Sequence, residues 1–397
     1  MDHLVRKLLA QKDGRPESAR VGEIAASRYV SRDVFERERR MFARVPSPIA
    51  LEADLVGAGA CVPSEIAGVP IVIVRAEDGI RAFKNACRHR GTALVSEPCK
   101  KKAFVCPYHG WTYDLSGHRI HVPHEECFRE SLSERTDLIS VHVEARHGLI
   151  WGALEPFDLD CHLRPLADDL RALEGLSLHR RSVREVRGNW KLIIDAFLDG
   201  YHIRHLHKDT VYRFFMDARF EAEHASPHIR AVTARRALFE RKDLPLRELV
   251  TPSTFVFPST IVILHPDYAS LLTMTPLAPD RTRFVHTMLV PGDVAERPKG
   301  AIRERTTERS EGDDVAERPK GAIRERTTER SEGDDVRDHW DKSFALIDEG
   351  VFAREDLAIV EAMQRGIESG ANESLLFGEL EYGSLWFHEA LMAHDER

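Results

Sequence analysis

Two short arms of the chain each carry one cysteine and one histidine. The first arm contains Cys87 and His89, and the second contains Cys106 and His109. Two thiolates and two neutral imidazoles can hold a metal centre with unequal ends, because thiolates stabilise ferric iron whereas imidazoles carry no charge and raise the reduction potential. The residue types therefore predict one metal centre built from both arms.

The order of the ligands distinguishes two kinds of metal site. Structural zinc sites usually group like with like, with a close pair of cysteines followed by a close pair of histidines. Here each arm mixes the two residue types, as in a Rieske [2Fe–2S] centre, in which two cysteines bind one iron and two histidines bind the other. We interpret Cys87, His89, Cys106 and His109 as Rieske ligands, and structural zinc is the alternative.

The sequence around the arms favours a pair of hairpin tips. Val69 to Arg75 is rich in β-forming residues, and Ile80 to Lys84 is a return strand that enters the first arm. Gly91 and Gly110 each follow a histidine of the motif and would let the backbone approach the cluster closely. We therefore expect two tips that close over one cluster.

A second group of potential ligands lies between Asp195 and His207. Three histidines and two aspartates in this mostly apolar stretch would be costly to bury unless they bind something. We expect Leu192 to Leu206 to be helical. His202 and His207 are five positions apart, so a regular helix would turn them to different sides, and a π-bulge or the helix end is needed to bring them together.

Two histidines and one carboxylate form the site of non-haem Fe(II) oxygenases, with coordination positions left open. The carboxylate has to come from elsewhere in the chain. Asp356, at the start of an apolar helical segment, is the best candidate, and Glu355 is its rival. Spacing does not exclude His205 as a ligand, but we interpret it as a pocket or hydrogen-bonding residue. Asp199 lies three positions before His202 and shares its helical face.

Composition limits the possible partners and location. The 397 residues carry a net charge of −8 and no large basic block, which disfavours nucleic acid as a partner. No apolar run is long enough for a membrane span, and the first residues do not resemble a signal peptide. The cysteines outside the two arms show no paired spacing, so we expect free thiols and a cytoplasmic protein.

The order of predicted elements indicates an α+β protein of two domains. Residues 1–45 are expected to form a helical arm, and residues 46–160 a small β domain that holds the cluster. Residues 180–397 contain strands followed by helices, which predicts an antiparallel sheet wrapped over a long helix. Phe197, Phe255, Phe257 and Met274 are candidates for the lining of its pocket.

One polar segment is repeated without any change. Residues 293–313 recur as residues 314–334, with six acidic and five basic residues in each copy. Structural repeat families drift outside their core positions, so identity favours a recent tandem duplication or an assembly error. Such a segment can loop out or extend a surface helix, and we assign it no chemistry.

The two sites together resemble the large subunit of the Rieske non-haem iron oxygenases, the aromatic-ring-hydroxylating family. The motif of Asp199, His202 and His207 is similar to the iron motif of that family, and Glu355-Asp356 to its third-ligand motif. The resemblance implies a helix-grip fold for the second domain, one [2Fe–2S] cluster, and one mononuclear Fe(II) held by His202, His207 and Asp356. It also implies that Asp199 links His202 to the Rieske His109 of a neighbouring subunit. Asp195-Ala196 departs from the Glu-Asn that often precedes this motif.

The resemblance also implies an activity and partners. We expect an oxygenase that uses O2 and electrons from an NAD(P)H-dependent reductase, with or without a ferredoxin, to hydroxylate or dihydroxylate an apolar, aromatic small molecule. A homotrimer is expected, with or without a small beta subunit. The alternatives are a monooxygenase that demethylates or acts on a quaternary amine, and a Rieske electron carrier with a ligand-binding domain. The sequence does not identify the substrate.

Overall fold

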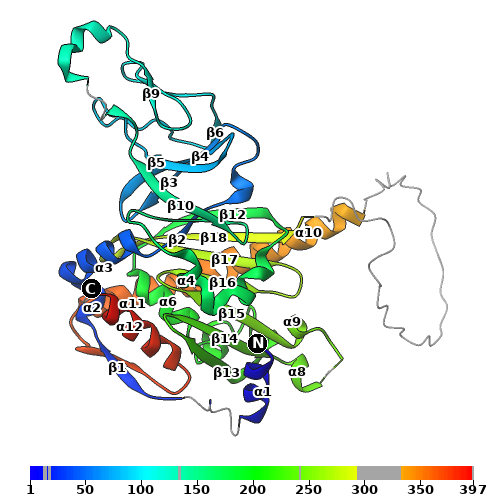
Figure 1. Ribbon diagram of the computed structural model, residues 1–397. Helices are drawn as coiled ribbons and strands as arrows, with labels where there is room; N and C mark the ends of the chain where they lie inside the picture. The colour runs from blue at the N-terminus through cyan, green and yellow to red at the C-terminus, as the bar shows by residue number, and fades with distance from the viewer. Residues whose placement is uncertain (12–15, 17–18, 133–135, 241–242, 293–331, 396–397) are drawn as a thin grey trace, which may run out of the picture.

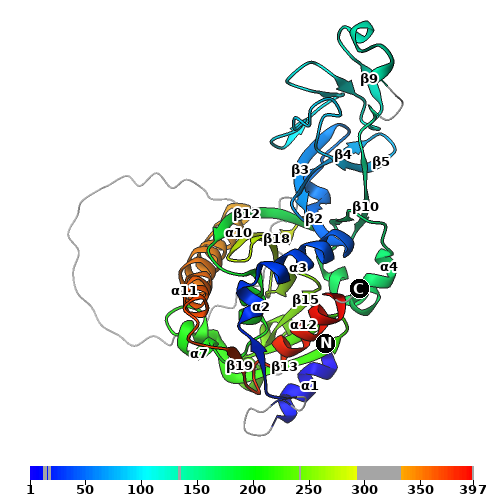
Figure 2. The same cartoon turned by 90° about the vertical axis from the view of Figure 1, so that its left-hand side faces the viewer.

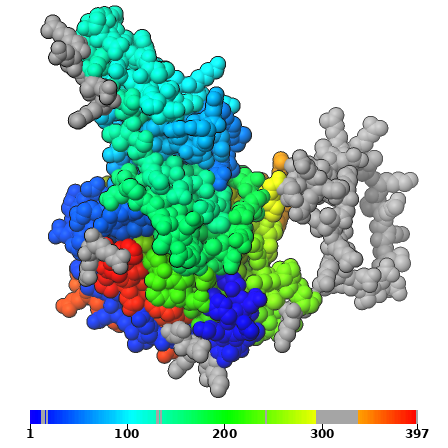
Figure 3. Space-filling view, viewed as in Figure 1, coloured from blue at the N-terminus to red at the C-terminus, as the bar shows by residue number. Residues whose placement is uncertain are grey.

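The computed structural model describes residues 1–11, 16, 19–132, 136–240, 243–292 and 332–395. Figure 1 shows a narrow β lobe, from the first half of the chain, above a larger body of sheet and helices. The space-filling view shows the same lobe projecting from the body (Figure 3). The arrangement confirms an α+β architecture with an N-terminal β domain.

The β lobe contains two antiparallel sheets. One has seven strands in the order β2-β11-β10-β5-β4-β3-β6, and the other has the order β7-β8-β9. The strands are β2 (Ser47–Leu51), β3 (Ala60–Ile66), β4 (Val69–Ala76), β5 (Gly79–Lys84), β6 (Cys99–Lys100), β7 (Phe104–Val105), β8 (Thr112–Tyr113), β9 (Arg119–His121), β10 (Ser140–Arg146) and β11 (Leu149–Ala153).

Strand β4 explains why this sequence forms a two-sided sheet. Ile71 and Ile73 pack into one apolar cluster, and Val72 and Val74 pack into another. Because successive side chains of a strand point to opposite faces, a continuous apolar run buries both faces of the sheet. The face with Val72 and Val74 also covers Cys87 and Cys106.

The structure pairs two cysteines that show no paired spacing in the sequence. Cys61 of β3 lies directly opposite Cys99 of β6 in the antiparallel register, and both are free thiols. Burial, with the nearby Cys99 as a second cause, raises the pKa of Cys61 to about 11.

The larger body is built on a seven-stranded antiparallel sheet with the order β12-β18-β17-β16-β15-β14-β13. Alternation again sends neighbouring residues to opposite faces: Leu271 packs against the linker that follows the β lobe, and Leu272 packs into the main core. The strands are β12 (Leu176–Val186), β13 (Phe215–Ala225), β14 (His228–Arg235), β15 (Val250–Val256), β16 (Thr260–Leu264), β17 (Ala269–Ala278) and β18 (Arg281–Pro291).

Helices cover the face of this sheet that carries the main core. Figure 2 shows α10, α11 and α12 around the sheet, with α3 below the β lobe. The elements on this side are α3 (Arg32–Arg44), α6 (Trp190–Phe197), α7 (Ile203–Leu206), η6 (Tyr212–Phe214), α10 (Glu332–Phe344), a π-helix (Ala345–Asp356), α11 (Leu357–Glu368) and α12 (Tyr382–Asp395).

Shorter elements complete the described chain. They include a two-stranded sheet that joins the two ends of the sequence, β1 with β19, and a helical linker between the lobe and the body. These elements are α1 (Asp2–Ala10), β1 (Gly22–Ala25), α2 (Ser27–Val30), η1 (Glu52–Asp54), η2 (Glu125–Ser131), α4 (Leu159–Leu163), η4 (Arg164–Leu166), α5 (Ala167–Leu170), η5 (Arg171–Leu173), α8 (Ala237–Glu240), α9 (Leu246–Leu249) and β19 (Ser374–Phe377).

The expectation of one helix from Leu192 to Leu206 is wrong. Helix α6 ends at Phe197, and the chain turns before α7 begins at Ile203. Gly200 lies so close to Phe220 that a Cβ atom there would be 2.5 Å from the Phe220 Cβ. Asp199 also accepts a hydrogen bond from the Tyr201 backbone N–H, which stabilises a turn instead of a helix.

A buried ion pair fixes the N-terminal arm to the body. The Lys191 ammonium donates to both carboxylate oxygens of Glu38 at 2.7 and 2.8 Å, and the Trp190 indole donates to the same carboxylate at 2.9 Å.

Among the described helices, none combines the length and apolar composition needed to cross a membrane. The repeated segment lies outside the described residues except for its last three positions, where α10 begins.

Candidate metal centres

The two arms of the β lobe form turns with the same hydrogen-bond pattern. In each arm the backbone carbonyl of the cysteine accepts from the glycine four positions later, and the cysteine N–H donates to the residue one position beyond that glycine. The bonds are Gly91 N to Cys87 O at 2.8 Å, Cys87 N to Thr92 O at 2.8 Å, Gly110 N to Cys106 O at 3.0 Å and Cys106 N to Trp111 O at 2.8 Å.

Both glycines of the motif have a backbone conformation that favours glycine. Gly91 and Gly110 have φ angles of 80° and 74°, in the left-handed region that glycine adopts without strain. A Cβ atom on Gly91 would meet nothing within 4 Å. At Gly91 the turn therefore requires glycine for its backbone conformation and not for close packing.

The turns bring all four side chains of the motif to one end of the lobe. The Nδ1 atoms of His89 and His109 are 3.1 Å apart, and Cys87 and Cys106 influence each other's ionisation. The Tyr113 hydroxyl lies 3.3 Å from the Cys87 Sγ atom. Two imidazole nitrogens and two thiols that converge in this way are the donor set of a two-iron cluster with unequal ends.

The surroundings affect the two thiols differently. Burial raises the pKa of Cys87. Burial also opposes ionisation of Cys106, but the backbone N–H groups of Tyr108 and His109 outweigh that effect, so the pKa of Cys106 falls below its ordinary value. Backbone donors of this kind stabilise a thiolate ligand.

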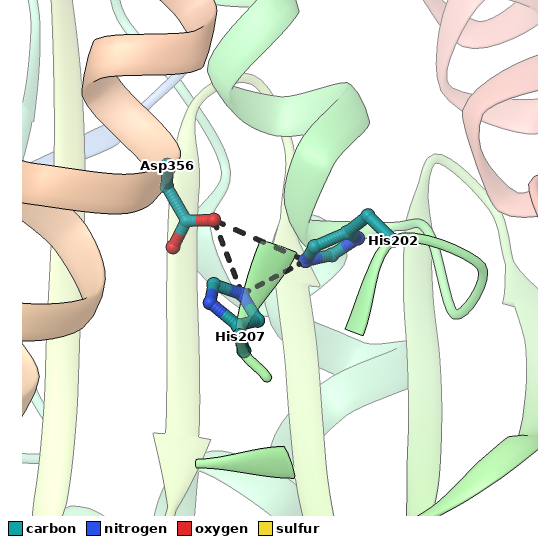
Figure 4. A group of neighbouring side chains, drawn as sticks. All are labelled: His202, His207 and Asp356. Carbon is teal, nitrogen blue, oxygen red and sulfur yellow. Dashed lines mark hydrogen bonds and ion pairs between the residues drawn. The ribbon is translucent and has the colours of Figure 1, made fainter. Parts of the chain in front are cut away.

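In the body, three side chains converge from two distant segments. His202 lies in the turn before α7, His207 directly follows α7, and Asp356 ends the π-helix. The Nε2 atoms of His202 and His207 are 3.1 Å apart, and Asp356 Oδ1 lies 3.3 Å from His207 Nε2 and 3.9 Å from His202 Nε2. Figure 4 shows the three side chains pointing toward one common position.

The geometry of these three donors fits a metal ion. Asp356 Oδ1 is buried and has no hydrogen-bond partner, although two imidazole nitrogens face it. Adjacent ligands at right angles around an ion with bonds of about 2.1 Å lie about 3 Å apart, close to the separations observed here. The arrangement therefore has the donors and spacing of a site with two histidines and one carboxylate.

A second carboxylate holds each histidine from its other side. His202 Nδ1 lies 3.1 Å from Asp199 Oδ2, and His207 Nδ1 lies 2.7 Å from Glu355 Oε2. Metal-binding histidines usually donate their free ring N–H to such an acceptor, which fixes the tautomer and the ring orientation. Sequence reasoning treated Glu355 only as a rival of Asp356 and missed this role.

The π-helix explains how Asp356 reaches the histidines. The sequence predicted that a π-bulge or the end of the helix brings His202 and His207 together, and the structure shows helix ends there and a π-helix in the C-terminal segment. Asp348, within it, accepts from Arg184 and Ser182 of β12 and pairs with His286 Nδ1 at 3.0 Å. Burial opposes its charge, but these partners lower the pKa of Asp348 to about 2. These contacts attach the π-helix to the sheet.

Two other polar residues of the motif lie apart from the donors. His205 is exposed and lines neither cavity next to the metal donors, so the expectation of a pocket role is wrong. Asp195 is buried, accepts from the Tyr29 hydroxyl at 2.8 Å and lies 3.2 Å from His388 Nε2.

A cavity of about 330 Å³ contains the three donors. Phe197 and Phe352 form part of its apolar wall, with ring centroids 5.4 Å apart. The other three predicted lining residues are wrong, because Phe255, Phe257 and Met274 pack in the main core and do not line this cavity. Sequence reasoning also missed Arg235 and His265, which line it from strand β14 and the turn after β16.

Comparison with known families matches both parts of the chain. Residues 46–139 match the Rieske [2Fe-2S] domain, and residues 173–395 match the ring hydroxylating alpha subunit (catalytic domain). The chain is 32% identical over 188 residues to the carnitine monooxygenase oxygenase subunit of Escherichia coli strain K12, covering 45% of this chain and 50% of that protein. It is 30% identical over 195 residues to the large oxygenase component of the naphthalene 1,2-dioxygenase system of Pseudomonas aeruginosa, covering 45% and 43%.

The aligned region spans about half the length of these relatives. Solved structures share the fold over more of the chain. A quaternary ammonium Rieske monooxygenase in complex with L-carnitine superposes with a TM-score of 0.73 at 21% identity, over 94% of this chain and 96% of the other. Naphthalene 1,2-dioxygenase from Rhodococcus sp., bound to indole, superposes with a TM-score of 0.72 at 18% identity, over 100% and 98%.

Proposed function

This chain belongs to the ring-hydroxylating alpha subunit family, with a Rieske [2Fe–2S] domain before its catalytic domain, and on that premise we propose that it is the oxygenase component of a multicomponent Rieske oxygenase. It would take electrons from an NAD(P)H-dependent reductase, directly or through a ferredoxin, and use O2 to hydroxylate or dihydroxylate an apolar, aromatic small molecule. The observation that carries this proposal is the convergence of His202, His207 and Asp356 in one cavity.

Each set of residues would hold one cofactor. Cys87, His89, Cys106 and His109 would hold the [2Fe–2S] cluster, and His202, His207 and Asp356 would hold the mononuclear ferrous ion. When bound, the two groups supply one-electron transfer and reductive activation of O2. The three donors line one cavity, so a small molecule would have space beside them.

The protein side chains orient this chemistry. Asp199 and Glu355 accept from the Nδ1 atoms of His202 and His207, so each Nε2 atom faces the metal position without a proton. Phe197 and Phe352 give the cavity an apolar wall that binds an apolar substrate and limits the entry of water.

We propose a homotrimer in which electrons pass between subunits. His109 is exposed in the turn between β7 and β8, in the small sheet whose third strand, β9, lies in the upper part of the projecting lobe (Figure 1). Asp199 lies next to His202 with its side chain 15% exposed. Asp199 would connect His202 to His109 of the partner subunit.

Complementation between two inactive variants tests this route. Co-expressed His109→Ala and Asp356→Ala subunits should consume O2 together although neither does so alone. Inactive mixed oligomers would contradict this route.

Two other functions remain as candidates. The identity to carnitine monooxygenase subunits favours a monooxygenase that demethylates or acts on a quaternary amine. A Rieske electron carrier with a ligand-binding domain would need the cluster but not the three donors. The four cysteines outside the Rieske motif form no disulfide in the described chain, which supports the cytoplasm as the proposed location.

Metal and labile-sulfide analysis tests the proposal. Protein purified without oxygen should contain about three irons and two sulfides per chain, and His202→Ala should lose about one iron while the Rieske spin-resonance signal is kept. Two irons in both proteins would leave only an electron carrier, and zinc without sulfide would exclude a Rieske centre. Asp356→Ala should behave like His202→Ala, and His205→Ala, at an exposed position of the same motif, is the matched control.

A further inference from the structure

The cavity next to the metal donors contains one arginine without a carboxylate partner. Arg235 is the last residue of β14 and lines the same cavity as His202, His207 and Asp356. Among the described residues, no carboxylate lies within ion-pair distance of its guanidinium. Its hydrogen bond within the described chain is a long one, from Nη1 to Thr251 Oγ1 at 3.4 Å.

The Arg235 guanidinium is partly buried beside two aromatic rings. Its central carbon lies over the rings of Phe214 and Phe215, each with its centroid 5.7 Å away, and these cation–π contacts stabilise part of the charge. Burial lowers the pKa of Arg235, but an arginine stays charged in proteins at any ordinary pH. Aromatic faces do not replace hydrogen-bond acceptors, so the N–H groups other than the one directed at Thr251 are available to an anion.

The acidic groups nearby do not fill that role. Glu248 and Tyr268 act on Arg235 only at longer range. Asp267 lines the same cavity, but its Oδ2 atom already accepts from His339 Nε2 and Trp340 Nε1, each at 3.0 Å. His265, also in the lining, is neutral because burial lowers its pKa to about 3, so it adds no competing positive charge.

We propose that the substrate carries a carboxylate, which Arg235 binds while the apolar part of the molecule lies toward the metal donors. This inference rests on the proposed function, because it treats the cavity as the substrate site. The planar guanidinium matches a carboxylate with two parallel hydrogen bonds, and the Thr251 hydroxyl lies beside it. Arg235 is thus a specificity-determining residue that selects an aryl or alkyl acid over a neutral hydrocarbon and repels a cation at that end of the cavity.

Calorimetric titration under anaerobic conditions tests the assignment without O2 or a reductase. The probes are benzoate, phenylacetate and cinnamate, each compared with its neutral amide, and phenyltrimethylammonium as a cation. At least one acid should bind about tenfold or more tightly than its amide. Arg235→Gln should remove that difference and leave amide binding unchanged, and Arg235→Lys should keep part of it. Acids that bind no better than their amides would overturn the proposal.

Further variants make the result specific. Arg236→Gln is the matched control, because Arg236 is exposed and donates to the Arg213 carbonyl outside the cavity. In His202→Ala the acid should still bind, whereas loss of binding there would show that the carboxylate binds the metal instead of Arg235. If thermal melting shows that Arg235→Gln is unstable, Arg235→Lys is used in its place. Acid selectivity that is unchanged in Arg235→Lys would contradict two parallel hydrogen bonds from the guanidinium to the carboxylate.

The two proposals can fail separately. Selective acid binding in a protein that contains only the iron of the cluster would support the role of Arg235 and overturn the oxygenase proposal. O2 consumption stimulated equally by an acid and its amide would support the oxygenase and overturn the role of Arg235.

Discussion

Two carboxylates hold the imidazole rings of His202 and His207 through the Nδ1 atoms, on the side away from Asp356. Asp199 and Glu355 accept from the two Nδ1 atoms, while Asp356 presents a buried, unpartnered oxygen to the two Nε2 atoms. Glu355 also accepts from the Thr210 hydroxyl at 2.7 Å, so its carboxylate is held in place before any metal binds. A ligand orientation fixed in this way increases metal affinity.

Replacing Glu355 with alanine should therefore weaken iron binding by about 10- to 100-fold without affecting the Rieske cluster. Glu355→Gln should lose less, because its amide oxygen can still accept from His207 Nδ1. Iron retained against a chelator measures the effect, and the Rieske spin-resonance signal reports the cluster. Glu349→Ala, at an exposed position of the same π-helix, is the control. Equal iron retention in all four proteins would show that Glu355 does not support His207.

Elements, not single residues, set the distance between the ligands. The turn at Gly200 ends α6 and lets His202 and His207 face one point, and the π-helix carries Asp356 to the same point. Asp348 attaches that helix to β12 and β18. The metal position thus depends on two irregular elements that pack on the same sheet.

The contact between the linker and the sheet contains the buried His228 and the half-buried His162. His228 Nε2 donates to the His162 carbonyl at 2.8 Å, and His228 Nδ1 accepts from the Phe257 N–H at 3.1 Å, so His228 is neutral. Burial lowers the pKa of His228 to about 4 and that of His162 to about 3, from an ordinary value of 6.5.

This contact predicts acid sensitivity. Between pH 6.5 and 4 the unfolded chain binds protons at these two positions and the folded chain does not, so the free energy of unfolding falls as pH falls. The limiting fall is about 1.4 kcal/mol per pH unit for each histidine. Melting temperatures of wild type and His228→Gln from pH 7.5 to 5 test this. The variant should be less stable at pH 7.5 but lose less on acidification, and exposed His121→Gln is the control. Parallel curves for wild type and His228→Gln would refute the assignment.

At the scale of the whole molecule, the two sets of ligands occupy different parts of an elongated chain. The arms lie in the projecting lobe, and the three donors lie in the body (Figure 1). Linker residues pack with Leu51 and Trp151 of the lobe and with Leu271 of the sheet in one apolar cluster, so the lobe is joined to the body by a packed interface. The exposure of His109 is compatible with the proposed transfer between subunits.

The repeated segment should contribute neither to the stability of the fold nor to the binding of the two metal cofactors. Deleting either copy, residues 293–313 or 314–334, gives the same protein, because the copies are identical. Its composition offers little apolar surface to bury, so the melting temperature should change by less than about 2 °C, and iron and sulfide contents should stay the same. Thermal melting and metal analysis of the shortened protein check this. Loss of folding or of either metal would show that both copies have a structural role.

The sequence by itself determined the chemistry of the protein. Each Rieske arm places its cysteine and histidine within a few residues, so local turn geometry brings them together, and the family match confirms a Rieske domain over residues 46–139. The same holds for the alternating strands and the α+β class, because strand periodicity depends on neighbouring residues. His202 and His207 could also be chosen from a short segment, although the sequence expected a longer helix there.

Only the tertiary structure decided which distant residues meet. Glu355 contacts His207 across 148 positions, and this contact places Asp356, not Glu355, beside the two Nε2 atoms. The exposure of His205, the π-helix and the isolated Arg235 in the cavity likewise follow from packing between segments far apart in the chain. Helices and strands can be predicted from residues that are adjacent in the sequence. A site made of residues far apart in the sequence depends on how the sheet and its helices pack together.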